Sequence, residues 1–130
     1  MRTIKFRGKK KKNGEWIYGD LMNDNIGGCY IYPIDSENLY KENEVIPDTV
    51  GQSTGLYDKD GNEIYEGDIL LFHGEVKRVV GYEDSHMASF SLLSPYDLGF
   101  MSTFGTGSFE PFYCEVIGNI HDNPELLKSL

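Results

Sequence analysis

The histidines and cysteines of this sequence are the residues most suited to nucleophilic catalysis or zinc binding, but none has a spacing typical of such a site. The three histidines, His73, His86 and His121, show neither Cys-x-x-Cys nor His-x-x-x-His spacing, so a zinc site would need ligands from distant loops. His121 beside Asp122 could act as a base, with Cys114 as the nucleophile. Cys114 lies in a predicted strand, however, where a buried and inert thiol is the common outcome. We therefore expect no catalytic residue, no metal and no cofactor.

The acidic segment Asp58-Lys59-Asp60-Gly61-Asn62 has carboxylates at alternate positions, as calcium-binding loops do. Counted from Asp58, an EF-hand loop needs glycine at position 6 and glutamate at position 12, whereas here Gly61 is at 4 and Ile69 at 12. Asp, Asn and Gly also favour turns by bonding their own backbone or accepting positive φ. The segment therefore predicts a turn between two short strands.

A second glycine-bearing segment, Gly51-Gln52-Ser53-Thr54-Gly55, could cradle a phosphate if it followed a strand and opened a helix. It lacks the lysine of a P-loop, and no helical pattern follows it. We expect a turn there as well.

Seven of the 12 basic residues precede the first acidic one; they are Arg2, Lys5, Arg7, Lys9, Lys10, Lys11 and Lys12. The rest of the chain has 5 basic and 21 acidic residues, a net charge of -16, which disfavours general binding to nucleic acid. The basic run ends in Asn13-Gly14, which favours a solvated hairpin turn. The alternative is a patch for phosphates or an acidic partner, with Trp16 or Tyr18 stacking on bases.

Aromatic residues gather in and after segment 94–108, which also holds Pro95, Gly99, Gly105 and Gly107. Loops of this length are usually functional or disordered, so we expect a mobile loop. No Lys or Arg occurs from Val79 to Leu127, which favours a protein-contact surface over base stacking. The candidate contacts in this loop are Tyr96, Phe100, Phe104 and Phe109.

The elements that position these residues are short strands separated by turn signals. Strands are predicted at 3–8, 16–22, 29–34, 56–57, 63–65, 69–72, 76–82, 89–93 and 112–117. Asn123 followed by Pro124 and Glu125 predicts a short terminal helix ending at Leu130. We expect a mainly β fold, a small barrel-like or sandwich domain of antiparallel strands with a short C-terminal helix.

The 130 residues suit one domain, 1–130. A division into an N-terminal β element, 1–50, and a barrel-like part, 51–130, remains open.

The segment from Val50 to Ile69 resembles the YopX protein family of phages and prophages in low-GC Gram-positive bacteria. The opening Ile4-Lys5-Phe6-Arg7, the segment from Trp16 to Leu21 and the ending from Glu115 to Leu127 are similar to the same family. The resemblance implies a mainly β, phage-encoded protein and brings no catalytic residues with it.

We expect a noncatalytic binding or oligomeric interaction module that contacts a host or phage protein or forms a homo-oligomer. The alternative is a small-barrel protein that binds nucleic acid through the basic N-terminal hairpin. No secretory signal pattern or membrane-length apolar stretch occurs, so we expect the bacterial cytoplasm, no membrane contact, and reduced Cys29 and Cys114.

Overall fold

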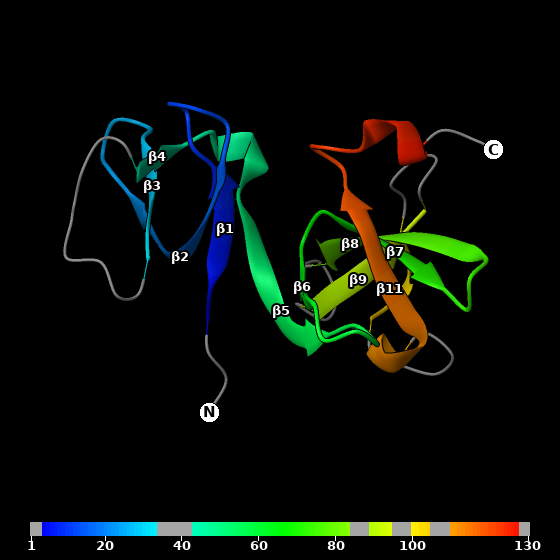
Figure 1. Cartoon of the computed structure of the whole chain (residues 1–130). Coiled ribbons are helices and arrows are strands. Elements are labelled where there is room, and N and C mark those ends of the chain that lie inside the picture. The colour runs from blue at the N-terminus through cyan, green and yellow to red at the C-terminus, as the bar shows by residue number, and fades with distance from the viewer. Residues whose placement is uncertain (1–3, 34–42, 84–88, 95–99, 105–109, 128–130) are drawn as a thin grey trace. The chain divides into compact units, whose positions relative to one another are not determined.

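The computed structural model describes residues 4–33, 43–83, 89–94, 100–104 and 110–127 (Figure 1). The chain divides into two compact units, Met1–Ser53 and Thr54–Leu130. The boundary falls inside a strand and close to the division that the sequence left open. Each unit has its own cluster of buried apolar side chains.

The first unit is an antiparallel sheet with the strand order β4-β3-β2-β1-β5. Its strands are β1 (Phe6–Lys9), β2 (Trp16–Asn23), β3 (Cys29–Tyr32), β4 (Glu44–Val45) and the first residues of β5 (Gly51–Tyr57). A 3-10 turn, η2 (Pro47–Thr49), precedes β5. The hairpin between β1 and β2 closes at the lysine run, as the Asn-Gly signal predicted.

One face of this sheet is apolar. Ile17, Ile31 and Val45 form its buried cluster, and Phe6 and Leu21 pack against it. A Cβ atom on Gly8 would lie 3.1 Å from the Val45 Cβ atom, so glycine lets this backbone approach the cluster closely. The sheet therefore buries the residues on one face and leaves the alternate residues to the other.

The second unit contains the rest of β5, which neighbours β6 (Glu63–Tyr65), and a five-stranded sheet of order β10-β9-β8-β7-β11. Its strands are β7 (Asp68–Phe72), β8 (Val76–Glu83), β9 (Ser89–Leu93), β10 (Phe100–Thr103) and β11 (Cys114–Asn119). Two 3-10 turns, η4 (Pro111–Tyr113) and η5 (Pro124–Leu127), flank β11. Ile69, Leu70 and Phe72 are fully buried, so β7 is covered on both faces.

The prediction of a mainly β fold is confirmed, but two of its details are not. The described strands form two antiparallel sheets and no closed barrel: β10 and β11 lie at opposite edges of the second sheet, and in the first sheet a single bridge, Lys10 with Val45, joins β4 to the end of β1. The C-terminal helix is only the 3-10 turn η5. The Asn123 side chain accepts the backbone N–H of Asn119, which precedes it, and the Leu126 N–H bonds the Asn123 carbonyl in the short 3-10 pattern.

The segment from Gly51 to Gly55 is a strand and not the expected turn. The Ser53 N–H donates to the Lys5 carbonyl at 2.7 Å, and the Thr54 hydroxyl donates to the Ile64 carbonyl at 2.8 Å. Both side chains are buried. Tertiary pairing on both sides thus overrides the local turn preference of a Gly-Ser-Thr-Gly sequence.

Asp58 holds together the turn between β5 and β6. Its Oδ1 atom accepts the backbone N–H groups of Asp60 and Asn62, and its Oδ2 atom accepts the Asn62 side-chain amide and the Val116 N–H of β11. Burial alone would raise the pKa of Asp58, but these hydrogen bonds outweigh burial and lower it below its ordinary value. The segment is therefore a carboxylate-organised turn, as its Asp and Asn content predicted.

Replacing Asp58 with alanine should destabilise the protein by about 2 kcal/mol or more, because several charge-assisted hydrogen bonds are lost at a buried position. Urea unfolding at neutral pH measures the change. Asp60→Ala, which removes an exposed carboxylate from the same turn, should cost less than about 0.5 kcal/mol. Equal effects of the two substitutions would contradict the role of Asp58.

The same carboxylate should make stability depend on pH. Since the folded-state pKa of Asp58 is lowered, its contribution is complete above the unfolded value, near 3.8, and is lost as the pH falls through the folded value. The difference in unfolding free energy between the original chain and Asp58→Asn should therefore shrink below about pH 4. A difference that stays constant through this range would exclude the linkage.

Candidate functional site

The outer face of the first sheet gathers most of the aromatic and cationic residues of its strands. Residues paired across antiparallel strands point to the same face. The register pairs Arg7 with Tyr18 and Lys9 with Trp16 on β1 and β2, Asp20 with Tyr32 and Met22 with Tyr30 on β2 and β3, and Tyr30 with Glu44 on β3 and β4. We call these nine residues the aromatic face.

Two cationic side chains of β1 lie near the ring of Trp16. The Arg7 guanidinium carbon lies 4.7 Å from the centre of the Trp16 ring, and the Lys9 Nζ atom lies 5.6 Å from it. Both distances are in the range of cation–π attraction. Arg7 is only 6% exposed, so its charge is directed at the indole and not at the solvent. The sequence placed Arg7 among the candidate phosphate contacts; in the structure its guanidinium lies against the Trp16 ring.

Two large apolar side chains of this face on β2 are exposed. Tyr18 is 45% exposed and Met22 is 51% exposed. The rings of Tyr30 and Tyr32 are half-buried and parallel, with 3° between their planes and 6.4 Å between their centres. The face therefore offers flat π surfaces on neighbouring strands, with no leucine, isoleucine or valine among its residues.

The lysine run makes the turn at one end of this face. The Lys10 N–H bonds the Glu15 carbonyl and the Gly14 N–H bonds the Lys10 carbonyl, which confirms a hairpin turn. Lys11 forms an ion pair with Glu44 of β4, with 3.0 Å between Nζ and Oε2. Lys12 is exposed. Lys5 directly precedes β1, and Arg2 lies outside the described residues.

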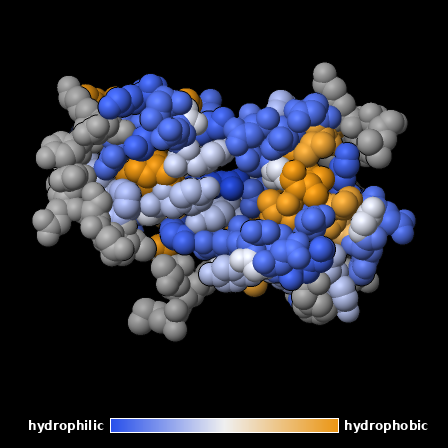
Figure 2. All heavy atoms as spheres, viewed as in Figure 1, coloured by the Kyte–Doolittle hydropathy of each residue, from blue (hydrophilic) through white to orange (hydrophobic). Residues whose placement is uncertain are grey.

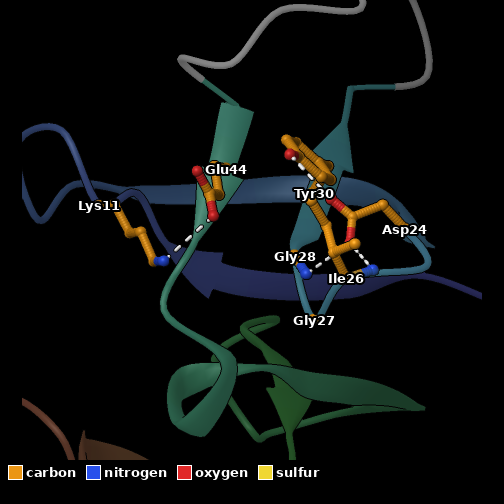
Figure 3. Close-up of a pocket in the computed structure, with 7 residues that line it drawn as sticks. All are labelled: Lys11, Asp24, Ile26, Gly27, Gly28, Tyr30 and Glu44. Carbon is orange, nitrogen blue, oxygen red and sulfur yellow. Dashed lines mark hydrogen bonds and ion pairs between the residues drawn. The ribbon is translucent and has the colours of Figure 1, made fainter.

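A shallow cleft of about 330 Å³ lies beside this ion pair, lined by Lys11, Asp24, Ile26, Gly27, Gly28, Tyr30 and Glu44 (Figure 3). The Asp24 Oδ1 atom accepts the N–H groups of Ile26 and Gly28, and the Tyr30 hydroxyl donates to its Oδ2 atom at 3.2 Å. The hydrogen bonds from Gly28 and Ile26 lower the pKa of Asp24. Burial, followed by the bond to Asp24, raises the pKa of Tyr30.

This carboxylate is thus used to build the turn between β2 and β3. Ile26, at the tip of the turn, is 91% exposed.

The thiol that the sequence offered as a nucleophile, Cys114, is buried in the second unit. Burial and the Asp58 charge raise the pKa of the Cys114 thiol to about 12, and its Sγ atom donates to the Pro111 carbonyl at 3.1 Å. In the described part of the chain, no three His, Cys, Asp or Glu side chains gather as metal ligands would. No helix among the described residues has the length and apolarity needed to cross a bilayer.

The protein-contact loop expected after Leu93 needs a correction. Phe104 is 7% exposed and belongs to the core of the second unit, where its ring meets Phe72 edge-on with 6.4 Å between ring centres. Phe100 begins β10, a strand that lies inside the segment predicted as a loop and pairs with β9. Tyr96 and Phe109 lie outside the described residues. Glycines and a proline on either side of the strand concealed it.

Sequence reasoning missed Tyr30 and Tyr32 as members of the aromatic face. The signal was present, because the alternation in Cys29–Tyr32 places the two tyrosines opposite Ile31. Assigning them to the same face as Trp16 required the register across the turn at Asp24, which sets Met22 against Tyr30.

Charge is unevenly divided between the two units. Residues 1–53 carry eight basic and eight acidic side chains, whereas residues 54–130 carry four basic and 13 acidic ones. The entire net charge of -9 therefore belongs to the second unit. Figure 2 shows mostly hydrophilic side chains on the drawn surface of the first unit and an apolar patch over β11 in the second.

The two thiols should react at very different rates. Both are free, but Cys29 is partly exposed whereas Cys114 is fully buried with a raised pKa. A chromogenic disulfide reagent at pH 8 should modify one thiol in the native protein and two in denaturant, and peptide mapping should assign the native reaction to Cys29. Rapid native labelling of Cys114 would contradict its burial.

The Arg7 and Trp16 contact should stabilise the first unit. Arg7→Met keeps an apolar stem of similar length but removes the charge, and should cost about 1 kcal/mol in unfolding free energy while shifting the Trp16 emission. Lys12→Met, at an exposed position of the adjoining turn, is the matched control and should change neither quantity. If both variants behave like the original protein, the contact does not hold Trp16.

Comparison with known proteins agrees with this geometry at the level of the fold. No curated protein matches the chain. Among solved structures, the crystal structure of protein EF1440 from Enterococcus faecalis is similar, with a TM-score of 0.53, 25% sequence identity, and coverage of 98% of this chain and 100% of that one. The family model described as YopX protein matches residues 5–128. The chain therefore belongs to the YopX family, as the sequence segments around Asp58 and near the two termini indicated.

Proposed function

We propose that this chain is a noncatalytic binding module whose binding surface is the aromatic face of the first unit. The observation that carries the proposal is the grouping of Trp16, Tyr18, Tyr30 and Tyr32 with cations on one side of a sheet whose other side forms the unit's core. Side chains of these types are enriched where proteins recognise macromolecules. The face is therefore suited to binding a partner molecule.

The structural use of the reactive groups supports the same function. Asp58 accepts four hydrogen bonds within the second unit, and the Cys114 thiol stays protonated at physiological pH because its pKa is about 12. Neither group is arranged for acid–base or nucleophilic chemistry. In this proposal the protein serves a phage or prophage in the bacterial cytoplasm as an accessory factor that acts through binding.

The test is a comparison of two double variants in which the altered side chains are similarly exposed. Tyr18→Ala with Met22→Ala alters the aromatic face, and Tyr57→Ala with Tyr82→Ala alters the second unit. Each tagged protein is immobilised and passed over host lysate, with and without nuclease. The original chain and the second-unit variant should retain the same macromolecules, and the face variant should retain at least about tenfold less.

Matching circular dichroism spectra and unfolding midpoints would show that both variants fold. Equal retention by a folded face variant would place the binding surface elsewhere and overturn the proposal.

A further inference from the structure

We propose that the aromatic face binds single-stranded nucleic acid, with bases stacked on its exposed rings and phosphates drawn to the lysines of the adjoining hairpin. This inference rests on the proposed function and names the partner class of the same surface. It is carried by three observations, which are the side-chain chemistry of the face, the position of the lysine turn, and the division of charge between the units.

The face provides stacking surfaces and not an aliphatic one. The large apolar residues of β1, β2 and β3, which are Phe6, Ile17, Leu21 and Ile31, all lie on the opposite side of the sheet. The apolar groups on the aromatic face are indole, phenol and thioether, and the remaining groups are charged. Every base has a π face, so aromatic side chains on adjacent strands can hold successive bases without reading their sequence.

Tyr18 is the strongest candidate for a stacking contact. It is 45% exposed on the central strand β2, beside Arg7 in the register. Trp16 has cations near its ring, at 4.7 and 5.6 Å, which fix its orientation beside Tyr18. Tyr30 and Tyr32 extend the platform onto β3 with parallel rings. A single strand crossing β2 and β3 would therefore meet several rings in turn.

The lysines of the hairpin turn adjoin one end of the aromatic face. Lys10 and Lys12 belong to the turn that joins β1 to β2, directly before Trp16. Lys11 bridges the turn to Glu44 and neutralises that carboxylate, one of the two acids of the face. This arrangement of a cationic track beside aromatic rings is typical of proteins that bind single strands.

The net charge of -9 is not carried by the unit that holds the aromatic face, because the acidic excess belongs to residues 54–130. The first unit is electrically balanced, and seven of its eight basic residues lie in its first 12 positions. At physiological salt, charges more than about 8 Å from a phosphate are largely screened. The local lysines therefore govern contact more strongly than the total charge does.

Trp16 is the only tryptophan of the chain, so its fluorescence directly reports binding at this face. The probe is an oligothymidylate of about 12 nucleotides, within the range of about 4–16 that small single-strand-binding domains cover. We expect saturable quenching of Trp16 emission. If three phosphates are contacted, affinity should fall roughly 20-fold between about 50 and 200 mM salt.

Three variants locate the interaction. Tyr18→Ala should weaken binding about tenfold by removing one stacked ring, whereas Tyr57→Ala in the second unit should leave it unchanged. Lys10→Gln with Lys12→Gln should reduce the slope of log affinity against log salt by about 1.4, and Lys59→Gln should not change it.

Two further titrations separate failure of this inference from failure of the proposed function. Equal affinity for a duplex of the same length would exclude base stacking. Quenching by polyglutamate with none by oligothymidylate would assign the face to an acidic protein, which overturns this inference but preserves a binding module. Absence of quenching by every probe overturns the inference as well, and the lysate comparison of face and second-unit variants then decides the proposed function separately.

Discussion

The second unit depends on one buried carboxylate. Asp58 closes the turn after β5 through two backbone N–H groups and at the same time accepts the Val116 N–H of β11, where the β11 register shifts before Gly118. A backbone donor at such an irregularity needs a partner, since a buried N–H left unbonded is costly. One side chain therefore determines both the local turn and the attachment of a strand far away in sequence. In the first unit, Asp24 likewise organises a local turn, the one between β2 and β3.

Much of the fold was predictable because short-range signals coincide with tertiary structure. The Asn13-Gly14 turn, the apolar run from Ile69 to Phe72 and the segment from Ser89 to Leu93 each carry a pattern that packing reinforces. The errors arose where packing opposed the pattern. Gly51 to Gly55 reads as a turn but pairs on both sides, and Asn123 has the sequence of a helix cap but bonds backwards to Asn119. Such choices depend on partners that local propensity does not contain.

Part of the candidate site could be predicted from the sequence. Trp16 and the lysines stood out by type and spacing, but the functions of the individual cations did not. Arg7 and Lys12 look equivalent in a basic run, although one is buried against indole and the other is exposed in a turn. Phe104 shows the reverse error, since an aromatic residue near glycines suggested a surface and proved to be core. Burial distinguishes these cases, and it depends on tertiary contacts that residue type does not reveal.

The position of β5 has a practical consequence for dividing the protein. Its early residues pair with β1, its later residues neighbour β6, and the boundary between the compact units falls at Ser53 and Thr54 within this single extended segment. No linker separates the halves at that point, so cutting the gene there would leave each fragment with a truncated strand and unpaired backbone groups along its edge. Such edges recruit other chains. Because the two halves of β5 have partners in different units, binding at the aromatic face is best measured on the full chain.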